Sequence, residues 1–549
     1  MLMKLRLGIL LLAIGLLLAA CSSSPEQPPE EKTPESGAIP IRVFAQQDAG
    51  QNLQTNAFSK YLEQTYGVKF DWDVIPYEGA KEKRQISLAS GNYPDTYILT
   101  AYIDQFSKAE ELRYGKQGIF LPLNDLIDKY APHIKAAFER NEALRELNTA
   151  PDGNIYGLVS YSECFHCSYP NKMWLNRKWL DKLGLSMPKT TADFKRVLEA
   201  FKKDDPNGNG AADEIPLSGS TEDFGVRIVP FLMNGFVYDD DRDYLMLKNG
   251  KVDTAANKPE WREGLAYIKS LYQEGLIDPG AFTQSAEAYK KLGDNDGVEI
   301  LGAGAAMHPE IFVGGETGSN RSRDYAPVPP LTGPHASYAV HDEGGINPGA
   351  KFVITNKATP EAQVALIRMI DYIHTPDGQI HAESGEEGVG WRKPLPGEQA
   401  LGKGVKPLFA GVVKPEGSPP TNTGWVGTGH FYMPKSYRDS WVQGTDMYAP
   451  DGYERRLQAA TELYAGKEPK NLFPAWNVWV DDASAQQANM LETNLKNYID
   501  QNTLQFITGA QDLDAEWDAY VRGLDDMGLS AYLAIMQKGY DDYLHARSK

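Results

Sequence analysis

Hydrophobic and polar positions follow two periods along the first hundred residues. Residues 68–74 alternate strictly, with apolar side chains separated by single polar ones, which is the pattern of a half-buried strand. Residues 39–45 and 96–99 are short apolar segments that also predict strands. Between them, apolar residues recur every four positions over 58–66, and 79–90 predicts a second helix that stops at glycine and proline residues. The order βαβαβ predicts an α/β fold with a mostly parallel sheet.

Helical patterns dominate the later part of the chain. Threonine residues precede an amphipathic stretch at 194–201, where a threonine can cap the helix, and Pro360 occupies the first position of a further helix. From Asn489 to the end the pattern is almost wholly helical, with breaks near Gly509 and Gly528. We therefore expect a helical C-terminal region after the α/β body.

The first twenty residues have the composition of a secretory signal. Lys4 and Arg6 precede an apolar run, 7–20, which is too short for a comfortable transmembrane helix. The sequence Leu-Ala-Ala-Cys at its end resembles the bacterial lipobox, in which cleavage occurs before the cysteine and the cysteine is acylated. We expect a signal peptide at 1–20 and a lipid-modified Cys21. The alternative is an uncleaved anchor with a chance cysteine.

The residues that follow the signal predict a tether. Residues 21–38 are rich in Pro, Glu and Ser and have almost no apolar side chain, which is the composition of an extended, disordered linker. A lipidated Cys21 would hold the folded body at the extracytoplasmic face of the cell membrane.

The charge of the chain narrows the set of partners. There are 55 Lys and Arg against 74 Asp and Glu, for a formal net charge of −19 at pH 7. Such an acidic chain is a poor candidate for nucleic-acid binding, which depends on basic surfaces. Hydrophobic residues make up 42% of the chain, which excludes a disordered or fibrous protein. Only three cysteines occur, so no disulfide framework holds the fold together.

The loop at 205–214 has the spacing of a calcium site. Oxygen-bearing side chains occupy positions 1, 3 and 5, and a glycine that permits a sharp turn occupies position 6, as in an EF-hand. Position 12 is Pro216 instead of a bidentate Glu, so residues at positions 9 and 10 would have to close the shell. The candidate ligands are Asp205, Asn207, Asn209, the carbonyl of Ala211, Asp213 and Glu214. We expect one structural Ca²⁺; the alternative is a polar Asn-Gly turn without metal.

Several segments behind the lipobox-like sequence occur in the order typical of one protein family. They are LASGNYPD at 88–95, LPLNDLI at 121–127, PDGNIYG at 151–157, WLNRKWLDKLG at 174–184, LYQEGLIDP at 271–279, EEG at 386–388, and FITG at 506–509 with EWDAY at 516–520. Together they resemble the family 1 extracellular solute-binding proteins, which are membrane-tethered receptors of ABC importers for sugars. The most similar subgroup is that of the long lipoproteins that include oligosaccharide and alginate binders, and it has a similar loop that holds calcium.

The resemblance implies an α/β, two-lobed, periplasmic-binding-protein-like fold of type II, whose lobes close like a hinge on a ligand. By analogy, lobe 1 comprises 39–160 and 325–378, and lobe 2 comprises 161–324 and 379–549. The resemblance also implies a monomer that is not an enzyme. It would bind a carbohydrate, expected to be an oligosaccharide, in the interlobe cleft and deliver it to ABC permease subunits.

Cys164 and Cys167 flank His166 and leave three alternatives open. A zinc site needs four ligands, and the remaining cysteine is expected to be acylated. Outside the membrane, a small-loop disulfide is favoured, with free thiols as the second alternative and a metal site as the third.

Aromatic residues gather in segments that the resemblance places near the crossings between the lobes. A flat ring stacks on the apolar face of a pyranose, while carboxylates, amides and Arg bind the hydroxyl groups. The expected ligand-binding residues are Tyr161, Tyr169, Trp174, Glu387, Trp391, Arg392 and Trp425. For any single Trp, core packing is the alternative.

Two other functions remain open. An extracellular glycoside hydrolase would share an aromatic cleft and needs two carboxylates, for which Glu386 and Glu387 are conceivable, although adjacent residues rarely face one sugar together. No HExxH, GxSxG or P-loop pattern occurs in the sequence. A binding module that passes its ligand to a sensor kinase would have the same sequence features as a transport receptor.

Overall fold

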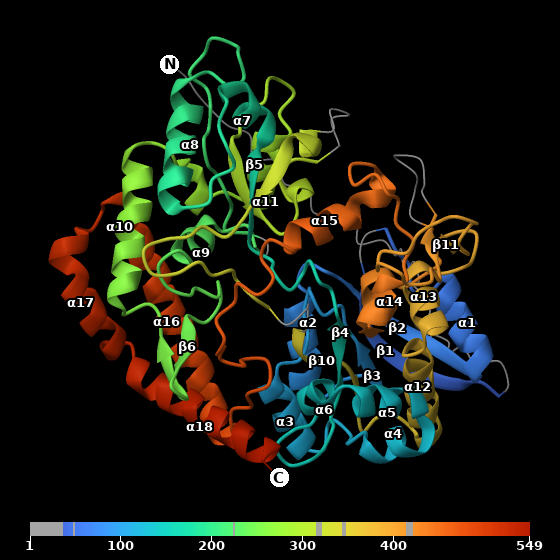
Figure 1. Cartoon of the computed structure of the whole chain (residues 1–549). Helices are drawn as coiled ribbons and strands as arrows, with labels where there is room; N and C mark the ends of the chain where they lie inside the picture. Colours follow the sequence, from blue (N-terminus) through green and yellow to red (C-terminus); the bar gives the residue numbers. More distant parts are fainter. Residues whose placement is uncertain are drawn as a thin grey trace, which may run out of the picture.

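The computed structural model describes residues 37–47, 50–222, 225–314, 321–342, 347–412 and 421–548. Within these residues the chain forms two α/β lobes, each built on its own sheet (Figure 1). The predicted signal peptide at 1–20 and the predicted lipidation site Cys21 lie outside the described residues.

Lobe 1 is built on a six-stranded sheet in the order β13-β4-β10-β3-β1-β2. Its strands are β1 (Ile39–Gln47), β2 (Val68–Pro76), β3 (Thr96–Ile98), β4 (Leu158–Ser162), β10 (Asn347–Ile354) and β13 (Tyr432–Met433). β1 pairs in parallel with β2 and β3, which confirms the predicted parallel βαβαβ unit. β10 runs antiparallel to β3 and β4, and β13 runs parallel to β4. The carboxyl ends of the parallel strands therefore all lie on the side of the sheet where β10, the antiparallel strand, begins.

Helices pack on both faces of this sheet because neighbouring side chains of β1 point to opposite sides. Ile41 and Val43 belong to one core, and Phe44 belongs to the other. The first core contains residues of α1 (Ala57–Tyr66), α4 (Asn124–Tyr130), α5 (Pro132–Arg140), α6 (Glu142–Asn148), α12 (Pro360–Ile373) and α13 (Pro376–Ser384). The second contains residues of α2 (Ala80–Ala89) and α3 (Lys108–Lys116).

Lobe 2 is built on a three-stranded sheet in the order β8-β5-β9. The strands are β5 (Lys172–Asn176), β8 (Ala303–Ala306) and β9 (Tyr325–Val328), and β5 is antiparallel to both neighbours. Met173 and Leu175 pack with α7 (Arg177–Leu183), α8 (Thr191–Lys203), α9 (Ile228–Met233) and α10 (Pro259–Gln273). On the opposite face, Trp174 packs with residues of α11 (Ala286–Gly293) and α15 (Tyr453–Thr461). The hairpin β6 (Leu245–Lys248) and β7 (Lys251–Thr254) completes the lobe.

Three helices form the predicted helical C-terminal region and run along one side of the molecule (Figure 1). They are α16 (Asp482–Thr508), α17 (Leu513–Asp526) and α18 (Leu529–Arg547). Gly509 and Gly528 separate them in left-handed backbone conformations, at the two predicted breaks. At the far end of α18, Arg547 Nε lies 3.5 Å from Glu146 Oε1 of lobe 1.

The strand pairing differs from the expected lobe boundaries in two places. Residues 325–328 form β9 and pair with β5, so this segment belongs to lobe 2 and the chain returns to lobe 1 only before β10. Residues 432–433 pair with β4, so part of the segment expected in lobe 2 belongs to lobe 1. Both differences have the same cause. The sheet to which a strand belongs is decided by partners more than a hundred residues away in the sequence, which the local pattern does not reveal.

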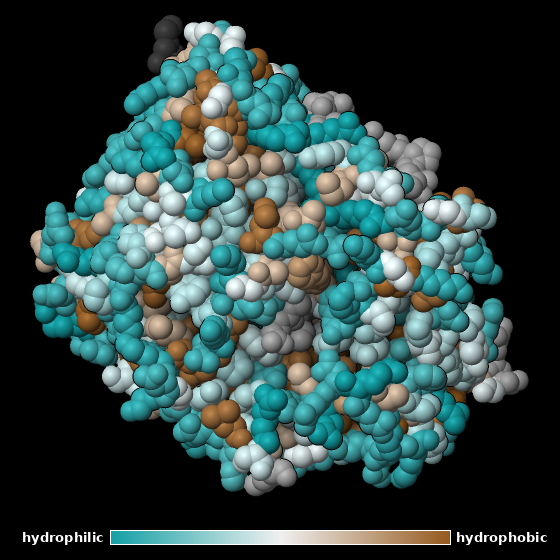
Figure 2. All heavy atoms as spheres, in the orientation of Figure 1, coloured by the Kyte–Doolittle hydropathy of each residue, from teal (hydrophilic) through white to brown (hydrophobic). Residues whose placement is uncertain are grey.

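An extension of lobe 1 comprises 386–412 and 434–444 and includes the short hairpin β11 (Trp391–Arg392) and β12 (Ala410–Gly411). It packs through Phe409 and Trp441 against Met433. Figure 2 shows a face on which hydrophilic residues predominate and hydrophobic ones form small separate groups, in keeping with the acidic composition.

Candidate functional site

The edge at which the parallel strands of lobe 1 end also carries the crossings to lobe 2. β4 ends at Ser162 and leads through 163–171 into β5, and β10 begins at Asn347 after the chain returns from β9. A third crossing, 440–452, joins α14 (Lys435–Asp439) on lobe 1 to α15, whose Leu457 packs in a core of lobe 2. Ligands of open α/β sheets bind outside the carboxyl ends of the strands. A binding site is therefore expected at this edge.

A cavity of about 300 Å³ lies at these crossings. Its volume is at the lower end of the range for small-molecule sites. Tyr161, Glu163, Phe165 and His166 line it from β4 and the first crossing, Lys435, Arg438 and Asp439 from α14, and Glu454 and Gln458 from α15. Because α14 packs on lobe 1 and α15 on lobe 2, a ligand in this cavity contacts both lobes.

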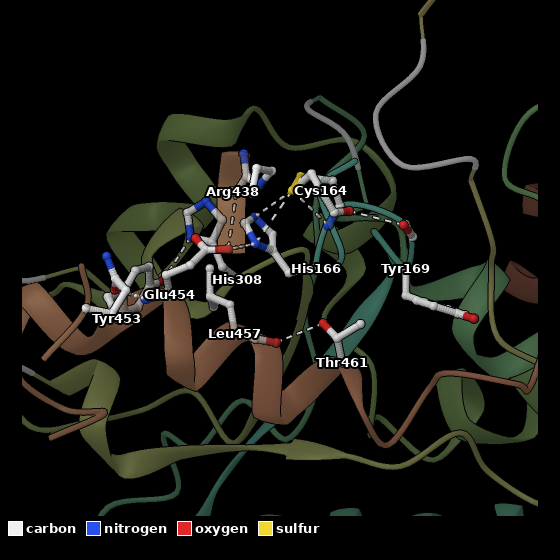
Figure 3. A network of polar contacts seen from close by, with 12 residues as sticks. Cys164, His166, Tyr169, His308, Arg438, Tyr453, Glu454, Leu457 and Thr461 are labelled. Atoms are coloured by element: carbon white, nitrogen blue, oxygen red, sulfur yellow. Dashed lines mark hydrogen bonds and ion pairs between the residues drawn. A yellow bond between two sulfur atoms is a disulfide. The ribbon is translucent and has the colours of Figure 1, made fainter. Parts of the chain in front are cut away.

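A buried polar network forms one wall of the interlobe cavity (Figure 3). His166 Nδ1 lies 2.6 Å from Glu454 Oε1, and Arg438 Nη2 donates to the same oxygen over 3.3 Å. Burial by itself would raise the pKa of Glu454, but the hydrogen bond from His166 and the charge of Arg438 outweigh it and lower the pKa. Burial lowers the pKa of His166. An uncharged His166 that donates its Nδ1–H to an ionised Glu454 accounts for both directions.

His308 extends this network from lobe 2. It follows the end of β8, and its Nδ1 lies 3.0 Å from the hydroxyl of Tyr453. Burial, followed by the nearby His166, lowers the pKa of His308 to about 4. The ring is therefore uncharged at neutral pH and acts as a hydrogen-bonding group.

A disulfide joins Cys164 to Cys167 in the first crossing. The structure thus contains the first of the three alternatives that the sequence left open. The turn is held further by Ser168 N, which donates to the carbonyl of Cys164 over 3.1 Å. Within the described residues, Cys164, His166 and Cys167 are the single group of His, Cys, Asp and Glu side chains close enough to share a metal ion. In the oxidised state the two sulfurs are bonded to each other and are not thiolate ligands.

Two predicted ligand residues, Tyr161 and Tyr169, lie at the first crossing. Tyr161 lines the interlobe cavity and stacks on Tyr432 at a centroid distance of 5.6 Å. The hydroxyl of Tyr169 donates to Glu468 over 2.6 Å, which ties the crossing to the segment after α15. Both rings are largely buried.

Trp174 and Trp425 correct the sequence expectation, because the structure places both in the cores. Trp174 is 0% exposed on the central strand β5, where helices cover both faces of the sheet, and its indole nitrogen donates to the carbonyl of Ala306. Trp425 is 1% exposed, donates to Ser59 Oγ, and packs edge-on against Phe58. Neither ring has a face left for a sugar.

Glu387 and Trp391 line a different hollow, which lies on the flank of lobe 1 and has a volume of about 840 Å³. The other walls of this flank hollow include Tyr61 and Tyr372. Arg392, beside it, makes an ion pair of 2.6 Å with Glu398. The structure therefore does not bring these three predicted residues together with Tyr161.

Three exposed hydrophobic side chains near the crossings escape the sequence analysis: Tyr102 is 57% exposed, Val426 52% and Phe165 37%. Tyr102 comes just after β3 and underlies η4 (Val426–Gly429), where a Cβ on Gly427 would lie only 2.0 Å from its hydroxyl oxygen. The sequence could have indicated Tyr102 by its position, because it lies just after the carboxyl end of a predicted parallel strand.

The loop at 205–214 folds around the first candidate calcium ligand, Asp205. The carboxylate of Asp205 accepts hydrogen bonds from the consecutive backbone N–H groups of 208–210. The side-chain amides of Asn207 and Asn209 both donate to the carboxylate of Asp213, at 2.9 and 2.8 Å. The side chains of the loop are thus joined in one hydrogen-bonded turn, although the ligand oxygens of Asp205, Asp213 and Glu214 do not all lie within 4.8 Å of one another.

Glu214 provides the test of whether the loop fits a cation. Its Oε1 is buried and has no hydrogen-bond partner. Burial, together with the charges of Asp213 and Asp205, raises the pKa of Glu214. A buried carboxylate oxygen without a hydrogen-bond partner is the kind of ligand that suits a hard divalent cation such as Ca²⁺.

Residues 45–380 match the family of bacterial extracellular solute-binding proteins. The chain belongs to this family. The fructooligosaccharide ABC transporter substrate-binding protein FusA of Streptococcus pneumoniae serotype 4 is 31% identical over 557 residues, which cover 98% of this chain and 97% of FusA. The polygalacturonan/rhamnogalacturonan-binding protein YtcQ of Bacillus subtilis is 22% identical over 393 residues, which cover 70% of this chain and 73% of YtcQ.

Solved structures of FusA share the fold. FusA in complex with kestose superposes with a TM-score of 0.73 at 28% identity, over 92% of this chain and 100% of that one. An EF-hand mutant of FusA in complex with fructo-nystose gives the same values. Among the described residues, no helix combines the length and the apolar character needed to cross a bilayer.

Proposed function

We propose that the protein is an extracytoplasmic receptor that captures an oligosaccharide in the interlobe cavity and delivers it to an ABC importer. The supporting observation is a cavity lined by both lobes at their crossings, in a chain 31% identical to a fructooligosaccharide receptor over 98% of its length. Closure of two lobes on a ligand is the usual response of such receptors. The receptor acts as a monomer.

The residues around the interlobe cavity suit a sugar. Phe165 lines the cavity and is 37% exposed, so its ring offers a face for the C–H side of a pyranose or furanose. Arg438, Glu454 and Gln458 supply donors and acceptors for hydroxyl groups. Lobe closure brings these two sets of groups together around one ligand.

Among the three carboxylates that line the interlobe cavity, Glu454 does not have the raised pKa that a hydrolytic function would need. A glycosidase needs a carboxylic acid with a raised pKa as proton donor. In the interlobe cavity, the pKa of Glu454 is lowered by His166 and Arg438 in spite of burial, so this carboxylate stays ionised. Glu386 and Glu387 are exposed on the flank of lobe 1.

Isothermal titration calorimetry with the mature protein and a panel of oligosaccharides tests the function. Fructo-, galacto- and xylo-oligosaccharides of two to four units form the panel, and a peptide of similar mass serves as the control. Binding of at least one oligosaccharide without release of reducing ends is expected. Binding of the peptide alone, or turnover of a bound sugar, would reject the proposal.

The receptor is held at the membrane by lipid on Cys21. The support is the lipobox-like sequence and the Pro-, Glu- and Ser-rich linker that follows it. The variant Cys21→Ser is expected to leave the membrane fraction, while a Ser22→Ala control stays bound. Retention of Cys21→Ser in the membrane would contradict lipid anchoring.

The 205–214 loop holds one structural Ca²⁺ through the six candidate ligands. The support is the unpartnered Glu214 oxygen and the EF-hand named in the FusA mutant structure. A chelator is expected to lower the melting temperature of the wild type but not of Asp205→Ala, because a cation bound only to the folded state stabilises it. The neighbouring Asp204→Ala serves as the control and keeps the sensitivity. A native protein that ignores the chelator and has no metal by elemental analysis would reject the site.

A further inference from the structure

The charged side chains of the interlobe cavity are paired with one another. The described lining residues include three carboxylates, of Glu163, Asp439 and Glu454, and two permanent cations, Lys435 and Arg438. Lys435 makes an ion pair with Asp439, and Arg438 lies 3.3 Å from Glu454. Each cation of the cavity therefore already has a carboxylate partner, and one carboxylate is left over.

The histidines of the interlobe cavity do not change this balance. His166 donates to Glu454, and His341 lines the wall beside the second crossing. Burial lowers the pKa of both rings, so neither adds a positive charge at neutral pH.

We infer that the interlobe cavity selects uncharged oligosaccharides and rejects those that contain uronic acids. The inference rests on the proposed function and names its ligand class. Family membership leaves the class open, because FusA is named for fructooligosaccharides and YtcQ for polygalacturonan.

The geometry of Glu454 makes a second carboxylate unfavourable. A uronate in the cavity would approach Glu163 and Glu454 without an unpaired cation among the described lining residues. Arg438 already shares its charge with Glu454, whose side chain is only 12% exposed, and Lys435 shares its charge with Asp439. A uronate would therefore add a negative charge to a cavity whose described lining residues already have one carboxylate in excess. Figure 3 shows Arg438 and His166 directed at the same carboxylate.

Hydroxyl groups meet no such obstacle. A sugar hydroxyl can donate to a carboxylate oxygen of Glu454 and accept from a guanidinium N–H of Arg438 that the ion pair leaves unused. It can also bond the side-chain amide of Gln458 on α15. A neutral sugar therefore gains hydrogen bonds while the ion pairs of the cavity stay intact.

Calorimetry on the mature protein tests the ligand class with matched pairs. Kestose and galactotriose are compared with trigalacturonate, and trigalacturonate with its methyl ester, in which the charge is removed from the same sugar. Neutral sugars are expected to bind at least about tenfold more tightly than trigalacturonate, with affinities that change little between low and high salt. Equal or tighter binding of the uronate would overturn the inference and leave the proposed function standing. Binding of no sugar at all by folded protein would overturn both.

Two variants are expected to weaken the selectivity. Glu454→Gln removes the partner of Arg438 at nearly constant shape and should improve binding of trigalacturonate relative to kestose by about tenfold. The same change at the flank, Glu398→Gln, frees Arg392 outside the cavity and should have no effect. Gln458→Arg adds an unpaired cation without breaking the pair, and it serves as the test if Glu454→Gln has a collapsed melting transition. Folded variants that keep the wild-type selectivity would overturn the inference.

Discussion

The interlobe cavity and the flank hollow have similar side chains and differ in what surrounds them. The hollow is the larger, at about 840 Å³ against 300 Å³, and it has aromatic rings beside carboxylates and lysines. All of its lining residues, however, lie within 57–64 and 372–393 of lobe 1. The cavity takes its walls from both lobes and from a crossing between them. For the proposed receptor function the cavity is the better candidate, because its walls come from both lobes, although the flank hollow has the larger volume.

The largest expected difference between the two regions is in how much one arginine in each contributes to the free energy of unfolding. Arg455 of α15 donates to four backbone carbonyls, those of Ala400, Leu401, Gln443 and Gly444, and so fastens α15 to the lobe 1 extension beside the cavity. Arg455→Ala is expected to lower the free energy of unfolding by about 3 kcal/mol, because half-buried carbonyls lose a charged donor. Urea denaturation measures the change.

Arg392 beside the flank hollow is the matched control for Arg455. It makes two hydrogen bonds with the carboxylate of Glu398 near the surface. Arg392→Ala should cost less than about 1 kcal/mol, since exposed ion pairs contribute little. Equal losses in the two variants would mean that the clamp on α15 is no stronger than a surface pair.

The second prediction concerns the disulfide between Cys164 and Cys167, which lies next to the interlobe cavity. Among the described residues, the turn at 386–390 beside the flank hollow has no such cross-link. Replacing both Cys164 and Cys167 with Ser should lower the free energy of unfolding by about 2 kcal/mol, the loop-entropy value for so short a loop. A reductant should lower the melting temperature of the wild type and leave the double variant unchanged. A wild type that is insensitive to reductant would show that the disulfide contributes nothing to stability.

Local rules made many of the helices and strands predictable. The strict alternation at 68–74 became β2, and the parallel βαβαβ unit followed from the order of periods. Thr190 caps α8 and Pro360 opens α12, because capping and proline geometry depend on neighbours along the chain. Sheet membership of β9 and β13 was not predictable, since it depends on partners far away in the sequence.

Burial explains why the candidate ligand residues were predicted only in part. Trp174 and Trp425 have the residue type expected of a sugar platform, yet Trp174 is core because its central strand is covered on both faces. Trp425, just before η4, is core because it packs against Phe58 of α1. Tyr161 lines the interlobe cavity, in the segment where the family resemblance placed the first crossing. The sequence did not predict that Arg438 and Glu454 lie in the cavity. They contact each other and His166 only because the third crossing brings 435–458 back over 161–168.

A ligand-binding variant sharpens the comparison further. Phe165→Ala should raise the dissociation constant for the bound oligosaccharide about fivefold, or about 1 kcal/mol, which is the scale of one aromatic contact. Trp391→Ala in the flank hollow should leave the dissociation constant unchanged. Calorimetry measures both, and a loss of affinity confined to Trp391→Ala would place the sugar on the flank.

The smallest expected effect is a difference between two carboxylates under acid conditions. A hydrogen bond from Arg392 lowers the pKa of Glu398 to about 2, and His166 with Arg438 lowers that of Glu454 in spite of burial. In both cases the unfolded chain binds the proton more readily, so each carboxylate stabilises the fold at neutral pH and loses this contribution as the pH falls below its ordinary value.

Glu398→Gln and Glu454→Gln should therefore both flatten the fall in melting temperature between about pH 5 and pH 3. At high salt the effect of Glu398→Gln should vanish, because its pair with Arg392 is near the surface and is screened. The effect of Glu454→Gln should persist, because the side chains of His166 and Glu454 are only 10% and 12% exposed and salt screens such a pair less. If high salt abolished both effects alike, the polar network of the interlobe cavity would be as open to solvent as the flank, and the contrast between the two regions would fail.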